Sequence, residues 1–85
     1  MYEKLVRSAR RSLNTVTREN PYGRFVTVTE DWMLSVTCEN WRTCTYSCEV
    51  WNGNTGEEHS MLFVGYENDR ELSEAMGLFA VRFIG

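Results

Sequence analysis

Two neighbouring stretches of the chain alternate apolar and polar side chains, and this alternation most restricts how the chain can fold. Residues 32–38 and 43–51 each place apolar side chains at every second position, which is the period of a strand with one buried face. If the two strands pair as a hairpin, a shift of one residue would bring the apolar face of one onto the polar face of the other. The compatible register with a short loop pairs Cys38 with Cys44 and Val36 with Tyr46. Its loop is Asn40-Trp41-Arg42.

Strands are also predicted on both sides of this hairpin. Residues 24–29 are rich in β-branched and aromatic side chains and form a first strand, with a turn at residues 30–31. Residues 52–56 carry the strongest turn signal in the chain and lead into a fourth strand near residues 58–66. Residues 61–64 are apolar at every position, which predicts a strand that is covered on both faces or lies centrally in the sheet.

Residues 2–18 are predicted to form a helix that ends before Pro21 and Gly23. Its apolar stripe recurs at steps of three and four residues and contains Tyr2, Leu5, Val6, Ala9, Leu13 and Val16. At 100° per residue, four basic side chains project on the opposite side, namely Lys4, Arg7, Arg11 and Arg18, with Arg10 beside them.

A second helix is predicted near the C-terminus, where Asn68 and Glu71 have the spacing of a capping box. Its apolar stripe consists of Leu72, Ala75, Met76, Phe79 and Phe83. Gly77 leaves an alternative open, in which a short helix is followed by a fifth strand at residues 78–84. The predicted fold class is α+β, with an N-terminal helix, a four-stranded antiparallel sheet and a C-terminal helix in a single domain over residues 1–85.

The composition excludes several classes of protein. With 42% hydrophobic and 25% charged residues, the chain is typical of a globular domain rather than a disordered one. No apolar run approaches the roughly 20 residues that span a bilayer, and the charged residues Glu3 and Lys4 near the start leave no apolar stretch of a signal sequence there. We therefore expect a cytoplasmic protein with no membrane partner. A chain of 85 residues leaves little interior for a closed substrate pocket, so we expect no enzyme activity.

The cysteines do not predict a metal site or a catalytic nucleophile. Cys38, Cys44 and Cys48 together with His59 would be an acceptable ligand set for zinc. However, Cys44 and Cys48 lie on one strand about 13 Å apart, too far for a single ion. A cysteine nucleophile would need His59 as its base, and no oxyanion hole is evident. We expect no metal and no cofactor, and we leave open a disulfide between Cys38 and Cys44.

Charge divides the chain into a basic first part and an acidic remainder, with a net charge of −3. The basic helix face (Lys4, Arg7, Arg11, Arg18) has the spacing to contact phosphates, which gives nucleic-acid binding as the alternative function. An acidic set lies near the last hairpin and the final helix, and it would fit a basic groove on a partner. This set comprises Glu57, Glu58, Glu67, Asp69, Glu71 and Glu74.

Trp41 and Arg42 at the predicted hairpin tip are of the types enriched in binding hot spots. Trp51 could likewise contact a partner, because it lies on the polar side of its strand. In its size, acidity and mixed α/β character, the chain resembles the small proteins that phages encode against bacterial defences, including anti-CRISPR proteins. This resemblance concerns the whole chain and assigns no residue a role. The expected function is a non-enzymatic binding module, an inhibitor or adaptor that docks on a protein or nucleoprotein partner. A homodimer is left open.

Overall fold

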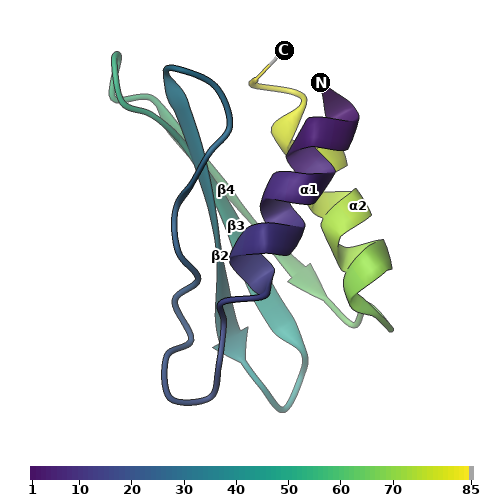
Figure 1. The fold of residues 1–85 in the computed structure, drawn as a ribbon. Helices are drawn as coiled ribbons and strands as arrows, with labels where there is room; N and C mark the ends of the chain where they lie inside the picture. The colour runs from purple at the N-terminus through teal and green to yellow at the C-terminus, as the bar shows by residue number, and fades with distance from the viewer. Residues whose placement is uncertain (85) are drawn as a thin grey trace.

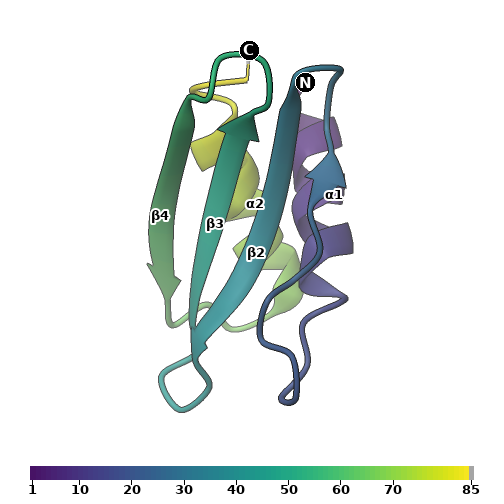
Figure 2. The ribbon, with the colours of Figure 1, turned by 90° about the vertical axis from the view of Figure 1, so that its left-hand side faces the viewer.

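Two helices lie side by side on one face of a four-stranded antiparallel sheet (Figure 1). The computed structural model describes residues 1–84. The elements are α1 (Tyr2–Leu13), β1 (Val26–Thr27), β2 (Trp32–Asn40), β3 (Thr45–Asn52), β4 (Glu58–Val64) and α2 (Asp69–Ala80). Each strand pairs with its neighbour along the chain, in the order β1-β2-β3-β4 (Figure 2). The predicted α+β fold, with a helix at each end of the sheet sequence, is confirmed.

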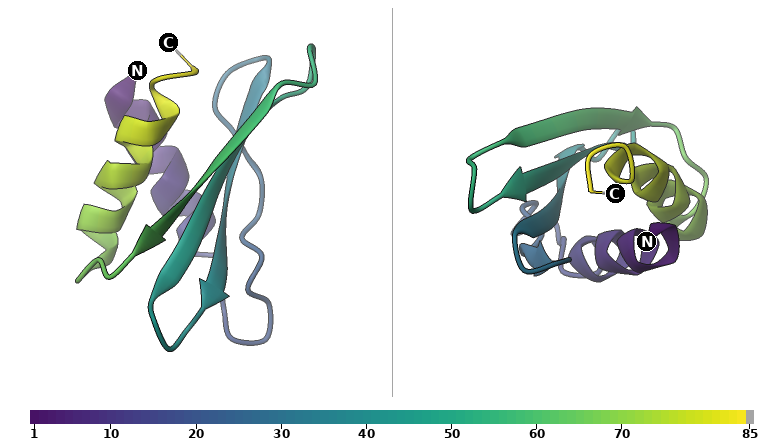
Figure 3. Two further views of the ribbon diagram at one scale, coloured as in Figure 1. Left: turned by 180° about the vertical axis from the view of Figure 1, so that it is seen from behind. Right: turned by 90° about the horizontal axis from the view of Figure 1, so that it is seen from above.

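The core lies between the sheet and the two helices (Figure 3). The alternation of β2 and β3 supplies one side of it, because Leu34 and Val50 point toward the helices and are fully buried. Leu5 and Ala9 of α1 and Met76 of α2 supply the other side and are also fully buried. Burial of these side chains holds the helices on one face and leaves the other face of the sheet without a covering layer in the described chain.

The β2–β3 hairpin keeps the predicted faces but not the predicted partners. The observed pairs include Leu34 with Val50, Val36 with Cys48 and Cys38 with Tyr46. The apolar faces therefore coincide, as the alternation requires, but the predicted pairs Cys38 with Cys44 and Val36 with Tyr46 are wrong by two residues. The hairpin loop is accordingly displaced toward the C-terminus.

The reason for this displacement is the turn itself. The Asn40 side chain accepts hydrogen bonds from the backbone N–H groups of Arg42 (2.9 Å) and Thr43 (3.3 Å). These bonds build a turn over residues 41–44, in which Cys44 adopts a left-handed φ of 52°. The register shifts between Cys38 and Asn40. An Asn side chain that competes for backbone donors therefore fixes this loop.

The first helix is shorter than predicted, because α1 ends at Leu13 rather than at residue 18. The next residues, Thr15-Val16-Thr17, are β-branched and favour helix weakly. Thr15 also bonds outside the helix, where its Oγ1 accepts from the backbone N–H of Arg24 (2.8 Å). The side chain of Val16 is only partly buried, and Arg18 lies in the following loop. The predicted first strand is likewise reduced from residues 24–29 to two residues, β1.

The fourth strand is an edge strand, so the prediction that it is central or covered on both faces is wrong. Leu62 and Val64 are each 60% exposed and Met61 is 46% exposed. Phe63 is buried on the helix side against Phe79, with ring centroids 6.1 Å apart. The apolar run of β4 therefore covers the core with one side and presents apolar side chains to solvent.

The second helix passes through Gly77, so the alternative of a fifth strand at residues 78–84 is wrong. A Cβ atom at Gly77 would lie 2.6 Å from Cγ2 of Val6, so this glycine lets α1 and α2 approach closely rather than ending the helix. The predicted start is confirmed, because the Asn68 side chain accepts from the backbone N–H of Glu71 (2.8 Å). After Ala80 the chain makes a turn that buries Ile84.

Candidate docking surfaces

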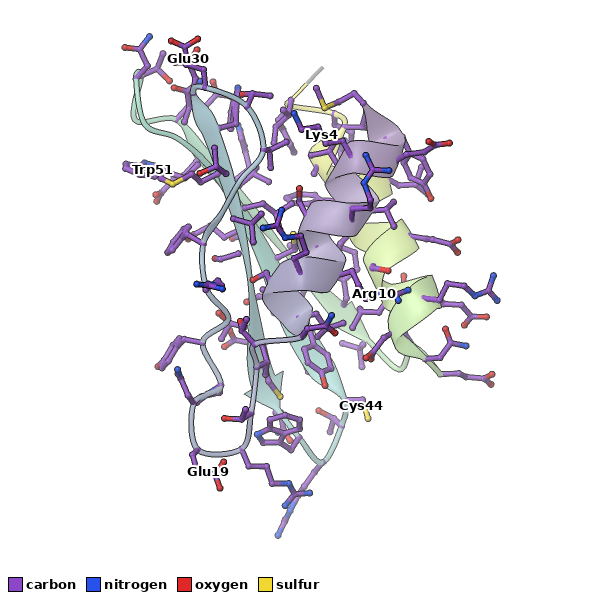
Figure 4. The ribbon with its side chains drawn as sticks, in the orientation of Figure 1. Lys4, Arg10, Glu19, Glu30, Cys44 and Trp51 are labelled. Atoms are coloured by element: carbon purple, nitrogen blue, oxygen red, sulfur yellow. The ribbon has the colours of Figure 1, made fainter. Side chains whose placement is uncertain are left out.

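The face of the sheet turned away from the helices, here called the outer sheet face, is not covered by another layer of the described chain (Figure 3). The strand register assigns to it every second residue of three strands: Met33, Ser35, Thr37 and Glu39 of β2, Thr45, Ser47, Glu49 and Trp51 of β3, and Glu58, Ser60, Leu62 and Val64 of β4. Trp51 projects from the sheet on the side opposite to both helices (Figure 4). It lies directly across from Met33.

A shallow groove of about 490 Å³ crosses the outer sheet face. Hydroxyl side chains form its floor, among them Ser35, Thr37 and Ser47. Tyr22 and Phe25 line it beside β2, and they are 70% and 53% exposed. Aromatic side chains held this far into solvent contribute little to the core. They are therefore available for contact with another molecule.

The segment that carries these two aromatic side chains is fixed to β2 by backbone contacts. The N–H of Gly23 donates to the carbonyl oxygen of Val36 (2.7 Å), and the N–H of Cys38 donates to that of Pro21 (2.8 Å). A Cβ at Gly23 would lie 2.4 Å from the Val36 oxygen, so only glycine permits this approach. Tyr22 forms a bridge with Thr37. The aromatic side chains are thus presented from an anchored segment.

Ser12 connects this segment to α1 from the opposite side of the sheet. Its hydroxyl donates to the carbonyl oxygen of Arg24 (2.7 Å) and accepts from the N–H of Val36 (2.8 Å). Ser12 is fully buried, and its bond to the Val36 N–H is buried as well, whereas its bond to the Arg24 carbonyl is partly buried. The end of α1, the loop and β2 are therefore held together at one atom, the Oγ of Ser12.

The groove on the outer sheet face is acidic. Its charged lining residues, within the part of the chain described, are Glu39 and Glu49. Glu39 accepts a hydrogen bond from the hydroxyl of Ser47 (2.9 Å), which holds its carboxylate over the sheet. Aromatic side chains beside carboxylates favour a partner segment with apolar and basic side chains, and the carboxylates disfavour a phosphate backbone.

A second apolar surface, here called the β4 edge surface, follows the free edge of the sheet and the adjoining side of α2. It consists of Met61, Leu62, Val64, Tyr66 and Leu78. Leu78 is 61% exposed, and together with Met61 it lines a groove of about 300 Å³ between β4 and α2. This surface was not predicted from the sequence, because the apolar run at residues 61–64 was expected to be buried.

The predicted hairpin tip does not present Trp41 freely to solvent. Trp41 is 38% exposed, and its ring meets Tyr46 edge-on, with centroids 6.3 Å apart. The Arg18 guanidinium lies 5.8 Å from the centre of the Trp41 ring. The structure thus takes Arg18 away from the predicted basic helix face and places it against the hairpin. Arg42 is exposed at the turn.

The basic helix face therefore retains three of its four predicted members, Lys4, Arg7 and Arg11, all exposed on α1. Figure 4 shows Lys4 near the start of α1, on the helix side of the molecule. Arg10 turns toward α2, where its Nε lies 3.4 Å from the hydroxyl of Ser73. Arg11 also lines an open hollow of about 590 Å³ with Arg24, beside β1.

The acidic set is divided between opposite ends of the sheet. Glu57 and Glu58 lie at the beginning of β4, whereas Glu67, Asp69 and Glu71 lie beyond its end, at the start of α2. The seven residues of β4 separate the two groups by roughly 20 Å. The sixth member, Glu74, borders α1 next to Arg7, and the side chain of Glu58 lies on the outer sheet face. These carboxylates do not form one continuous patch.

The cysteines are dispersed and free. Cys38 and Cys48 are buried in the sheet, and Cys44 is exposed at the hairpin turn. Burial raises the pKa of the Cys48 thiol to about 12, which disfavours the thiolate. Among residues 1–84, no group of three His, Cys, Asp or Glu side chains is arranged to hold a metal ion.

The histidine is engaged by its own strand and by the C-terminal turn. His59 pairs with Val50 in the sheet, while Cys48 pairs with Met61. Its Nε2 lies 2.6 Å from Oε2 of Glu57, and its ring stacks on Phe83 with centroids 3.8 Å apart. The His59 ring therefore contacts the Glu57 carboxylate and the Phe83 ring, and neither contact involves a cysteine thiol.

Comparison with known proteins gives no relative from which a role could be transferred. No protein-family model, curated protein sequence or solved structure matches the chain. Neither helix of the described chain has the length and apolar content needed to cross a bilayer.

Proposed function

We propose that this protein is a non-enzymatic binding module that acts as a small inhibitor or adaptor by docking on a protein partner through its outer sheet face. One observation carries the proposal. Tyr22 and Phe25 stand 70% and 53% exposed beside a groove whose charged lining residues, in the described chain, are Glu39 and Glu49. Exposed aromatic side chains supply large contact areas at interfaces, and the carboxylates select a partner segment that is basic.

The anchoring of the aromatic side chains supports the same function. The segment around Gly23 is fixed by backbone hydrogen bonds to β2 and by the Ser12 hydroxyl. A surface that is already ordered loses little conformational freedom when it binds, so more of the contact energy appears as affinity. Trp51 extends the aromatic area on the same face.

The test is capture of a partner from a nuclease-treated lysate, with mass spectrometry to identify it and the purified partner used to measure affinity. The double variant Tyr22→Ser with Phe25→Ser should weaken binding at least tenfold, since each interface aromatic contributes about 1–2 kcal/mol or more. Both residues are exposed, so the variant should keep its fold, which circular dichroism can verify. Unchanged affinity in a folded double variant would refute the assignment of the outer sheet face.

Nucleic-acid binding is the alternative, and Lys4, Arg7 and Arg11 on the exposed side of α1 favour it. Reversal of Arg7 and Arg11 to Glu is the matched control, because these residues lie on the other side of the molecule. A nucleic-acid partner would be lost with these reversals, would be released by nuclease and would dissociate steeply with added salt. A protein partner on the outer sheet face should be retained under all three conditions.

A further inference from the structure

The outer edge of β4 presents unpaired backbone groups. At one end of the β3–β4 pairing, the N–H of Asn52 donates to the carbonyl oxygen of Glu57 (2.8 Å). At the other end, the N–H of Gly65 donates to that of Cys44 (3.4 Å). Hydrogen-bonded pairs recur at every second residue of an antiparallel ladder. The odd-numbered residues of β4 therefore bond to β3, and the even-numbered residues direct their N–H and C=O groups outward.

This edge lacks the devices that protect edge strands. β4 contains no proline, lysine or bulge, and between Ser60 and Val64 it carries no charge. Met61 and Leu62 are 46% and 60% exposed on opposite sides of the strand, and Leu78 extends the apolar surface onto α2. An exposed, regular and apolar edge of this kind is suited to the addition of another strand.

We propose that two copies of this chain pair through β4 in antiparallel orientation, about a two-fold axis at Met61, and join their sheets into one. Two conditions select this register. Residues with outward N–H groups, such as Ser60 and Leu62, must face residues of the same kind in the second copy. In addition, the whole of Glu58–Val64 must pair with the same strand of the second copy. Both hold when Ser60 pairs with Leu62 of the second copy and Met61 faces its own equivalent.

The side chains of β4 are compatible with this arrangement. Glu58 faces Val64 of the second copy, so no acidic side chain of the strand opposes another. Met61 of the second copy arrives beside the groove of about 300 Å³ that Met61 and Leu78 line. A dimer thereby covers apolar side chains that the single chain exposes.

The two edges of the sheet explain why assembly stops at two copies. The opposite edge, β1, has only two residues, Val26 and Thr27, and offers little to pair with. Pairing of β4 with β4 uses the same surface on both copies and closes the assembly. A stable interface buries about 800 Å² per partner, which is about 15% of the 5335 Å² surface of this chain. The dimer must therefore cover the exposed side chains of Met61, Leu62 and Leu78 as well as the backbone edge of β4.

The mass in solution tests the dimer. Light scattering on the purified wild-type chain should give twice 9.9 kDa, falling to 9.9 kDa on dilution. Met61→Lys brings two positive charges together at the axis and should give 9.9 kDa at every concentration, as should Met61→Glu. An equimolar mixture of the two variants should recover the dimer mass. Asn54→Lys, which adds the same charge in the neighbouring turn, should remain dimeric.

Cross-linking tests the register. In a background of Cys44→Ser, which removes the exposed native thiol, Met61→Cys should form an intermolecular disulfide on mild oxidation. The two Cα atoms face each other as a non-hydrogen-bonded pair, about 4.5 Å apart. Ser60→Cys is the matched control and should cross-link poorly, because its equivalent in the second copy lies diagonally, about 7–8 Å away.

A wild-type chain that is monomeric at all concentrations would overturn the proposal, as would a dimer that Met61→Lys leaves intact. Equal cross-linking of the two cysteine variants would refute the register. If the wild-type chain is monomeric and Met61→Lys abolishes binding of a captured partner, the β4 edge is a docking site for that partner and not for a second copy of the chain, which also overturns the proposal. The β4 edge surface shares Leu62 and Val64 with the outer sheet face but contains neither Tyr22 nor Phe25, so failure of the dimer leaves the docking function to be decided by the Tyr22 and Phe25 variants.

Discussion

Replacement of Ser12 by alanine should destabilise this protein far more than the loss of one hydroxyl group usually does. The hydroxyl is fully buried and serves two elements at once, since it donates to the carbonyl of Arg24 and accepts from the N–H of Val36. Alanine leaves the Val36 N–H buried without an acceptor, which costs about 1–3 kcal/mol. Loss of the bond to Arg24 adds about 0.5–1.5 kcal/mol. The expected loss in the free energy of unfolding is about 2–4 kcal/mol.

The neighbouring Ser8 provides a matched control. It is also buried on α1, but its hydroxyl donates to the carbonyl oxygen of Lys4 within the same helix (2.9 Å). Alanine at this position loses only a local bond and gains helix propensity, so Ser8→Ala should change stability by less than about 0.5 kcal/mol. The two variants remove the same atom from the same helix and differ in what that atom connects.

Urea unfolding followed by circular dichroism measures both variants. With a slope of about 1 kcal/mol per M for a small chain, Ser12→Ala should lower the midpoint by about 2 M or more. Hydrogen exchange adds a local measurement, because the Val36 amide should lose protection in this variant first. If Ser12→Ala and Ser8→Ala unfold at the same urea concentration, the claim that Ser12 joins α1 to β2 is incorrect.

Further predictions concern the helix contact, the hairpin and the thiols. Gly77→Ala should destabilise the fold by about 1–2 kcal/mol in urea unfolding despite a better helix propensity, because its Cβ would lie 2.6 Å from Cγ2 of Val6. Trp41→Ala should cost about 1–2 kcal/mol, the sum of one edge-on aromatic contact and one cation–π contact. In a thiol-labelling assay, Cys44 should react at once and the two buried thiols only on unfolding. Between pH 9.0 and about 12 the unfolded chain loses the Cys48 proton that the folded chain keeps, so stability should fall by up to about 1.4 kcal/mol per pH unit. A flat stability profile over that range would contradict the raised pKa.

The sequence predicted those features that depend on local periodicity. The alternation of β2 and β3 identified the core face, and Asn68 marked the start of α2. The exact register was not predictable in this way, because two registers that differ by two residues satisfy the same alternation. The choice between them depends on the backbone bonds to the Asn40 side chain. Similarly, Thr15 ends α1 by bonding to Arg24, a residue that periodicity does not connect with it.

The candidate docking surfaces were harder to predict than the fold. An apolar run such as that of β4 predicts burial, and the run reads the same in a central strand as in an edge strand. The exposure of Leu62 therefore became clear only from the strand order. Tyr22 lay outside every predicted element, and Phe25 lay in the predicted strand at residues 24–29, of which the structure keeps only Val26–Thr27. The sequence signal for their exposure was their position close to Pro21 and Gly23, where a turn keeps large side chains near the surface.

The order of the strands has a consequence for how the chain folds. Every strand pairs with its neighbour, so the sheet forms from consecutive hairpins with short loops, and such local contacts favour rapid folding. The contact between the helices is different, because Arg10 and Ser73 are 63 residues apart in sequence. Closing that span costs more chain entropy than any hairpin, so the helix contact should form after the rate-limiting step. Changes at Gly77 should therefore speed unfolding and leave the folding rate nearly unchanged.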